Sequence, residues 1–432
     1  MAHSVDPDRW RAGFAEVMGR VGGRFGRVEP RRRARAFVLG LLAGLPRMNC
    51  WTIAEHAGDA TPDGMQYLLG RARWDADEVR EDLRGYVIDH LGDSGAVLVV
   101  DETGDLKKGT TTVGVQRQYT GTAGRIENAQ VGVYLVYATA AGHTFLDRAL
   151  YLPRSWTDDP VRCRAAGVPE DVVFATKPAL AGVMIARALD AGTPASWVAA
   201  DEVYGNDPKF RAGLHARGIG YVLAVACDHT VTIPTCPGPR RAVDLAAALP
   251  DHIWARYSAG RGAKGDRLHD WAMLEITDPD APGCSWLLIR RGIGTGDLAF
   301  YRAYAPTPVS LPALVRVAGR RWAVEEAFQT GKGLTGLDEH QVRRWTSWHR
   351  WTILAMLAHA FLSVMTAAAR AGASTAAELI PLTRNEIHHL FARLINPPTV
   401  TPEHLLNCST WRRRHQARAQ AAHYRKQAAQ LA

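Results

Sequence analysis

Residues 97–102 read VLVVDE, an apolar run that ends in two carboxylates, and residues 197–202 repeat the arrangement as WVAADE. Short apolar runs of this kind, bounded by turn-forming residues, predict buried β-strands. Asp101 and Asp201 therefore each follow a predicted strand at its carboxyl end. Open α/β sheets place their functional sites at that edge, because the loops diverge there and leave a crevice.

The chain around these two runs switches from helical to strand patterning at Gly95 and then mixes both patterns. The strand patterns alternate or are continuously apolar, whereas the helical segments have apolar residues at helical spacing. The resulting order β-β-β-α-β-α-β predicts a mixed α/β sheet rather than an uninterrupted series of βαβ units. The predicted strands cover residues 97–100, 113–119, 131–138, 144–152, 197–200 and 221–226, and the predicted helices cover 178–190 and 207–217.

Composition divides the whole chain into five predicted regions. The outer regions are helical, and proline- and glycine-rich turns with short strands interrupt the central one. The regions are a basic helical, DNA-binding segment at 1–93, the first part of an α/β core at 94–227, an inserted β subdomain at 228–308, completion of the core by a helix at 309–340, and a helical segment with a basic tail at 341–432.

Both ends of the chain concentrate positive charge. Arg31, Arg32 and Arg33 precede an apolar helical run, and the last 22 residues hold six Lys or Arg, including Arg412, Arg413 and Arg414, with no carboxylate. Together with a formal net charge of +9, these clusters suggest a polyanionic partner. Each cluster is equally compatible with a simply solvated surface. Two short predicted helices near residues 51–57 and 63–72 fit either a helix-turn-helix or a small bundle.

Several classes of protein are disfavoured by the sequence. The six cysteines show no paired spacing, so neither a zinc site nor a disulfide framework is indicated, and we expect a reducing, cytoplasmic setting. The polar and acidic residues 1–11 do not fit a signal peptide. The apolar run at 352–369 is interpreted as a buried core helix rather than a membrane segment, so no membrane partner is expected.

A third carboxylate lies on the predicted helix RRWAVEEAFQTGK at residues 320–332. Arg321 and Glu325 are four residues apart and Lys332 is seven beyond, so all three share one helical stripe. Such a stripe could be a salt-bridged solvent face. The apolar residues around it favour a packed helix instead.

These features resemble the catalytic core of DDE insertion-sequence transposases with a ribonuclease H-like fold. The similarity is greatest to the cut-and-paste branch with a Y-x2-R-x3-E-x6-K signature and a β insertion before the catalytic glutamate, and it spans residues 95–340. This sequence departs from the signature at Ala318, where the family has tyrosine. The spacing selects Glu325 over Glu326. The residues that carry the resemblance are Asp101, Asp201, Arg321, Trp322, Glu325 and Lys332.

The resemblance implies an enzyme that binds and cuts DNA. Asp101, Asp201 and Glu325 would be catalytic and would hold two Mg²⁺ or Mn²⁺ ions about 3.5–4 Å apart for in-line displacement at a phosphodiester. Arg321 and Lys332 would contact DNA phosphates. The resemblance further implies that Trp322 stacks on a displaced base, although plain core packing is an equal alternative.

The expected activity is transposition of a bacterial insertion sequence. The partners would be the terminal inverted repeats and a double-stranded DNA target, with a dimer in the synaptic complex and a cytoplasmic, nucleoid-associated location. Two alternatives stay open. A domesticated transposase would bind DNA without cleaving it, and a ribonuclease H-like nuclease would cleave without strand transfer.

Overall fold

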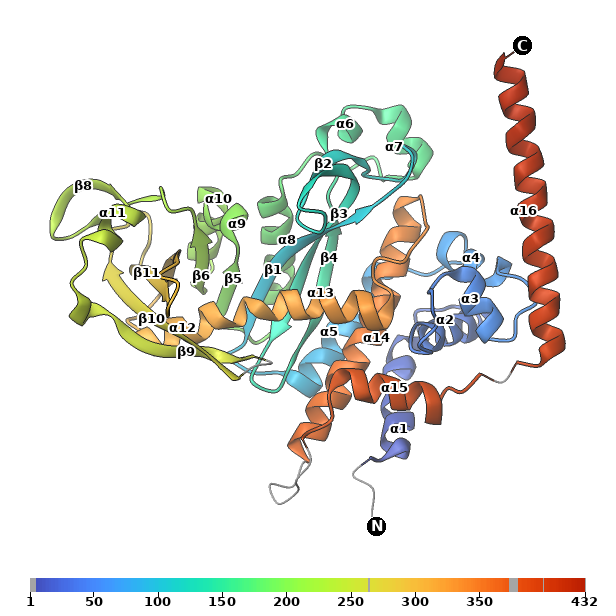
Figure 1. Ribbon diagram of the computed structural model, residues 1–432, viewed down its shortest axis with the longest axis horizontal. Helices are drawn as coiled ribbons and strands as arrows, with labels where there is room; N and C mark the ends of the chain where they lie inside the picture. Colours follow the sequence, from blue (N-terminus) through green and yellow to red (C-terminus); the bar gives the residue numbers. More distant parts are fainter. Residues whose placement is uncertain (1–4, 263–264, 373–379, 399, 432) are drawn as a thin grey trace. The chain divides into compact units, whose positions relative to one another are not determined.

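The computed structural model describes residues 5–262, 265–372, 380–398 and 400–431 (Figure 1). The chain forms two compact units. Unit 1 contains residues 1–83 and 330–432, and unit 2 contains residues 84–329. Unit 1 therefore contains most of the two predicted helical ends together with residues 330–340 of the predicted core, and unit 2 contains the rest of the predicted core, the insertion and residues 84–93. Helices α5 (Ala76–Leu91) and α13 (Trp322–Thr335) each contribute residues to both units.

Unit 2 is built on a mixed ten-stranded sheet, which confirms the predicted fold class. Its strand path is β2-β3-β1-β5-β6-β12-β11-β10-β9, and β4 pairs with β3 off this path. The pairs β1–β3 and β3–β4 are antiparallel, whereas β1–β5 and β5–β6 are parallel. The first strands are β1 (Val97–Leu106), β2 (Gln116–Thr120), β3 (Arg125–Ala138), β4 (His143–Leu150), β5 (Trp197–Ala200) and β6 (Gly220–Val225).

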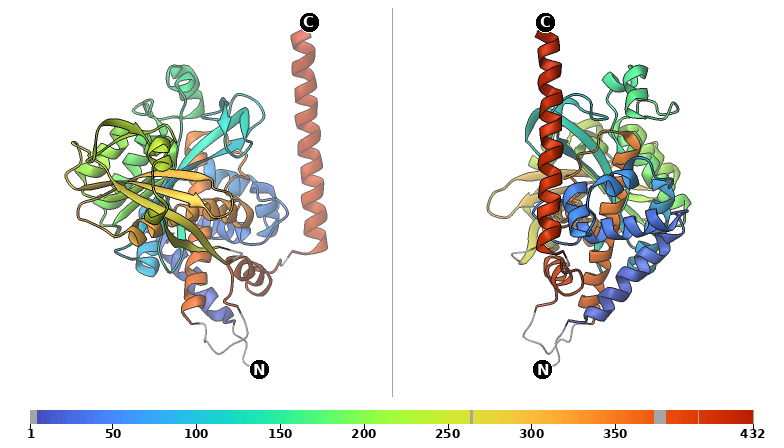
Figure 2. Two further views of the ribbon diagram at one scale, coloured as in Figure 1. Left: turned by 60° about the vertical axis from the view of Figure 1, so that its left-hand side comes forward. Right: turned by 90° about the vertical axis from the view of Figure 1, so that its right-hand side faces the viewer.

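Within residues 228–308, expected as an inserted β subdomain, the last four strands continue the main sheet, whereas β7 and β8 pair with each other in a separate two-stranded sheet. Strand β12 pairs antiparallel with β6, and β11, β10 and β9 follow in order. These strands run alongside the central strands in Figure 1 and in the left view of Figure 2. The pairing joins strands that are far apart in sequence, which local periodicity does not encode. The inserted strands are β7 (Thr230–Ile233), β8 (Cys236–Arg241), β9 (Ala255–Gly262), β10 (Gly265–Glu275), β11 (Cys284–Gly292) and β12 (Leu298–Ala305).

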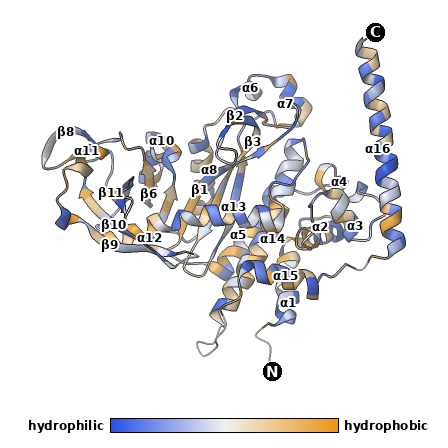
Figure 3. Ribbon diagram, in the orientation of Figure 1, coloured by the Kyte–Doolittle hydropathy of each residue, from blue (hydrophilic) through white to orange (hydrophobic). Residues whose placement is uncertain are grey.

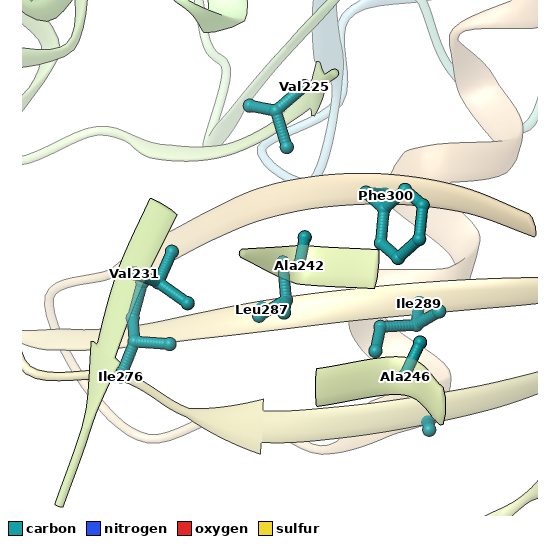
Figure 4. Packing of buried hydrophobic residues seen from close by; sticks show 9 residues of the cluster. Val225, Val231, Ala242, Ala246, Ile276, Leu287, Ile289 and Phe300 are labelled. Atoms are coloured by element: carbon teal, nitrogen blue, oxygen red, sulfur yellow. The ribbon is translucent and has the colours of Figure 1, made fainter. Parts of the chain in front are cut away.

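The insertion has its own apolar core, in which helix α11 (Ala242–Ala247) packs with the added strands. Ala242 and Ala246 lie near Leu287, Ile289 and Phe300 in this cluster (Figure 4). The small alanine side chains let the helix approach the strands closely. Burial of this apolar surface stabilises the packing of the inserted strands and α11.

Helices between the strands of unit 2 begin at recognisable caps. The Thr176 side chain accepts from the N-terminal backbone of α8 (Lys177–Asp190), and Asp207 does the same for α10 (Pro208–Ala216). Each of these helices also has a proline in its first turn. The other helices of this unit are α6 (Arg154–Thr157), α7 (Pro160–Ala166), α9 (Glu202–Gly205) and α12 (Leu311–Arg320), with a 3-10 turn at Asp251–Ile253.

Unit 1 is helical. Asn49 and Thr52 form a reciprocal capping box at the start of α3, and α4 packs against α2, α3 and α14. Figure 3 colours the last helix, α16, as a mixture of hydrophilic and hydrophobic residues. The helices are α1 (Pro7–Gly22), α2 (Val28–Leu41), α3 (Cys50–His56), α4 (Asp63–Gly70), α14 (Trp345–Ala371), α15 (Arg384–Leu394) and α16 (Pro402–Leu431).

Helix α14 contains the long apolar run noted in the sequence. By length and composition it is the one helix among the described residues that could cross a membrane, and 83% of its most apolar window is buried inside the protein. Phe361 of α14 packs edge-on against Phe14 of α1 and Phe391 of α15. Its surroundings are therefore those of a core helix of unit 1.

Candidate active site

The parallel pairing of β1 with β5 brings Asp101 and Asp201 to neighbouring positions where β5 ends. Asp101 was predicted to end its strand, but it lies in the middle of β1, because the pairing with β3 continues the strand through the polar residues up to Leu106. Val100 lies opposite Ala200 in the register, so Asp101 and Asp201 are the next residues on neighbouring strands. Asp101 continues β1, which is paired on its other side with β3. Asp201 instead ends its strand, and its side chain accepts a hydrogen bond of 2.9 Å from the backbone N–H of Val203.

Burial and crowding of like charges disfavour ionisation of these aspartates. The pKa of Asp101 is raised well above its usual value, first by burial and then by the charges of Asp201 and Glu102. The pKa of Asp201 is raised to about 6, again first by burial and then by Glu102. Such concentrated negative charge in a site is what a bound cation would relieve.

Helix α13 and the residue before it bring the third predicted carboxylate to the same place. The guanidinium of Arg321 lies 3.9 Å from an oxygen of Asp101 and 3.7 Å from an oxygen of Glu325. Both distances are measured to the same nitrogen, so the two carboxylate oxygens are no more than about 8 Å apart. Arg321 therefore provides part of the positive charge that balances the acidic cluster.

Glu102 is a functional neighbour that the sequence did not reveal. Lys177 of α8 donates to one of its oxygens at 2.6 Å, and the hydroxyl of Tyr204 on α9 donates to the other at 2.6 Å. Strand alternation predicts that Glu102 points away from Asp101. It nevertheless contributes to the raised pKa of both aspartates. Both partners come from helices whose positions depend on tertiary packing, so no sequence motif could identify them.

The other residues of the predicted helix occupy distinct surroundings. Glu326 lies 3.7 Å from the Nε2 atom of His143 on β4 and thus has a different neighbour from Glu325. Trp322 is 50% exposed, so it is a surface residue rather than a fully packed core residue. Lys332 is half-buried and stands seven residues beyond Glu325 on α13.

The arginine clusters of unit 1 are only partly free. Arg31 and Arg32 are exposed, but Arg33 lies 3.4 Å from Asp59. On α16, Arg412 pairs with Glu55 of α3, whereas the neighbouring Arg413 and Arg414 are exposed. The predicted DNA contacts therefore separate into paired and solvent-facing arginines.

The donor set suits a hard divalent cation, although the side chains are not arranged as a complete metal site. Among the described residues, no group of three or more His, Cys, Asp or Glu is close enough to hold a metal ion. Asp101, Asp201 and Glu325 would supply the carboxylate oxygens that Mg²⁺ and Mn²⁺ prefer. The raised pKa values of both aspartates indicate that a bound cation would stabilise their ionised forms.

The mixed sheet with its flanking helices is that of the ribonuclease H-like fold class. Residues 20–243 match the family described as DDE superfamily endonuclease. The chain belongs to this family, and its resemblance to DDE insertion-sequence transposases is confirmed. It is 31% identical over 197 residues to a protein of Microchaete diplosiphon described as "Probable transposase for insertion sequence element IS701". That match covers 45% of this chain and 49% of the relative, so the chain spans about half the length of the curated relative it matches.

Proposed function

We propose that this protein is the transposase of an insertion sequence, which binds the terminal inverted repeats and carries out metal-dependent phosphodiester hydrolysis and strand transfer. The proposal is supported by the adjacent positions of Asp101 and Asp201 on neighbouring strands and by Arg321, whose guanidinium lies within 4 Å of both Asp101 and Glu325. Family membership and the similarity to a probable transposase support it.

In this function the three carboxylates would hold two Mg²⁺ or Mn²⁺ ions. When bound there, one ion would activate the attacking oxygen and the other would stabilise the leaving oxygen. Arg321 would keep the acidic cluster from repelling the DNA backbone, since its guanidinium already lies beside two of the carboxylates. Lys177 and Tyr204 would fix Glu102, so that its charge stays next to both aspartates.

Trp322 and Lys332 would complete the contacts to DNA. The half-exposed indole of Trp322 offers a surface on which a displaced base could stack. Lys332 would bind a phosphate as a point charge. Arg31, Arg32 and Arg33 at one end of the chain, with Arg412, Arg413 and Arg414 at the other, would bind DNA outside the cleavage site.

The assembly that performs this reaction would be a dimer holding two DNA ends, because excision of an element requires both ends to be cut together. Its location would be the cytoplasm, on the chromosome when bound. Its target would be double-stranded DNA.

The test is incubation of the full chain with DNA that carries the element's ends and Mg²⁺, analysed on a denaturing gel. We expect nicking at the ends by the wild-type protein and a loss of orders of magnitude in Asp101→Asn. Binding to the ends without cleavage, with Mg²⁺ and with Mn²⁺, would instead favour a domesticated DNA-binding protein. Cleavage products without any joined strands would favour a nuclease that lacks strand transfer.

A further inference from the structure

A cavity of about 180 Å³ lies in unit 2 between the inserted strands and the start of α13. One water needs only about 10–15 Å³ by the same measure, so a larger group fits. Arg267, His269 and Trp271 alternate along β10 and therefore line the cavity from one face of the sheet. Arg290 of β11 is the direct cross-strand neighbour of Trp271.

The cavity walls hold buried hydrogen-bonding atoms with no partner among the described residues. These atoms are Nδ1 of His269, Nε1 of Trp271 and Nε of Arg290. Trp271 is only 1% exposed. A buried polar group left without a partner costs about 1–3 kcal/mol, so native proteins rarely keep several together unless water or a ligand satisfies them. Trp271 and Arg290 can offer only donors there, which calls for a ligand rich in acceptors.

The charge of the cavity is positive. None of its lining residues is an aspartate or glutamate. Among the described residues, Arg267 donates to the backbone carbonyls of Ala259, Gly260 and Gly319 and to no carboxylate. The pKa of His269 is lowered by burial and then by the charges of Arg290 and Arg267, against a smaller opposing effect of Asp270, in keeping with positive charge around the imidazole. An anion would offset both the charge and the unpartnered donors.

The position of the cavity identifies the anion. Arg321 and Trp322 also line it, and Arg321 lies 3.9 Å from Asp101. We propose that the cavity is a phosphate-binding subsite, in which Arg267, Trp271 and Arg290 hold one backbone phosphate of the DNA strand whose neighbouring phosphodiester lies at the carboxylates. The inserted strands thereby position the substrate. This inference rests on the proposed function, since it takes DNA as the substrate.

The first test is calorimetric titration of the full chain with inorganic phosphate at low salt in the presence of EDTA. We expect saturable binding in the wild type, at least about tenfold weaker binding in Arg290→Gln, and weaker binding in Trp271→Phe, which keeps the ring but loses the donor. Arg290→Lys should retain most of the affinity. Absence of phosphate binding by the wild type, or equal binding by Arg290→Gln, would overturn the proposal.

The matched control is Arg291→Gln on the same strand. Arg291 lies 3.6 Å from both Asp251 and Asp270 and covers the ring of Trp254, so its side chain has partners away from the cavity. This variant also loses one positive charge, but its affinity for phosphate should stay within about twofold of wild type. Thermal melts of each variant establish that it is folded.

A second arm distinguishes DNA phosphate from free phosphate. With a DNA duplex of random sequence in EDTA, Arg290→Gln should reduce the slope of log affinity against log salt by about one, and Arg291→Gln should leave it unchanged. An unchanged slope in Arg290→Gln together with lost phosphate binding would mean that the site serves free phosphate, which overturns the DNA assignment. These readouts need no metal and no cleavage, so they can fail while the proposed nuclease activity stands.

Discussion

At Asp201, burial of a carboxylate among other carboxylates makes the stability of the metal-free protein depend on pH. Its pKa of about 6 in the folded protein exceeds the value of 3.8 expected in the unfolded chain. The folded state therefore holds more protons than the unfolded state between these values, and stability falls as the pH rises through them. The ionised Asp201 therefore lowers the free energy of unfolding by its full amount above about pH 6 and has no effect on it below about pH 4.

Asp201→Asn should consequently raise the free energy of unfolding at pH 8, by about 1–2 kcal/mol after allowance for solvent screening. At pH 4 the variant and the wild type should melt together. The amide can still accept the hydrogen bond from Val203, so the cap of α9 is kept. Thermal melts in EDTA at pH 4, 6 and 8 measure this difference.

Asp244→Asn is the control for which we expect the opposite change in stability, because Arg241 holds the pKa of Asp244 below its usual value. This variant should be less stable than the wild type at pH 8. An Asp201→Asn protein that is also less stable at pH 8 would contradict the electrostatic description of the site.

The individual site residues could be predicted only where a short pattern marks them. Asp101 and Asp201 each follow a short apolar run, and Glu325 stands at a fixed spacing from Arg321, so their proximity could be expected before the structure was known. Glu102 could not be recognised in the same way. Its partners Lys177 and Tyr204 lie 75 and 102 residues further along the chain, and only the tertiary fold brings them together.

At the scale of elements, the contact between α12 and β9 depends on a glycine. A Cβ atom at Gly319 would lie 1.9 Å from the carbonyl oxygen of Ala259, a backbone atom that cannot turn away. Close approach of the helix to the strand therefore requires the absence of a side chain. The same contact places the helix end that leads to Arg321.

Gly319→Ala should destabilise the protein by about 1–3 kcal/mol, the usual cost of overpacking a well-packed contact. Gly213→Ala on α10 is the matched control, since a Cβ atom there meets nothing within 4 Å. That substitution should stabilise its helix by about 0.5–1 kcal/mol. Urea unfolding measures both, and equal tolerance of the two substitutions would contradict the described packing.

In unit 1, the contact of α14 with the end of α4 and the segment after it depends on a buried arginine. Arg350 of α14 is 7% exposed and donates to the carbonyls of Trp74 at 2.5 Å and of Leu69 at 3.4 Å. Arg350→Met should lower the stability by about 2–4 kcal/mol, because it leaves buried carbonyls without donors. The exposed Arg344→Gln should change it by less than about 0.5 kcal/mol. Denaturant melts followed by circular dichroism would contradict this if the two variants were alike.

Hydrophobic periodicity and helix caps predicted where most helices and strands of the α/β core lie. They did not predict which strands pair with each other. The predicted strand at 197–200 and the predicted helices at 178–190 and 207–217 match β5, α8 and α10 to within a residue. The strand patterns of the insertion were also visible. Their attachment to β6 was not, because hydrophobic alternation identifies a strand but not its partner.

At the scale of the whole molecule, the positive charge at the two ends of the chain should produce the salt dependence of DNA binding. Arg31→Gln with Arg32→Gln should reduce the slope of log affinity against log salt by about two, because both arginines are exposed and Arg31 donates to a backbone carbonyl, that of Phe25, rather than to a carboxylate. Arg33→Gln should change it little, since Arg33 already pairs with Asp59. Binding measurements between low and moderate salt check this prediction, and equal slopes for all three proteins would show that the cluster is merely solvated.

The most direct test of the proposed nuclease compares Glu325→Gln with Glu326→Gln for cleavage of end-bearing DNA in Mg²⁺. Glu325 shares Arg321 with Asp101, whereas Glu326 lies beside His143. We expect cleavage to fall by orders of magnitude in Glu325→Gln and only mildly in Glu326→Gln, with DNA binding in EDTA unchanged in both. Equal losses of cleavage in the two variants, or full cleavage by Glu325→Gln, would contradict the assignment of Glu325 to the catalytic cluster.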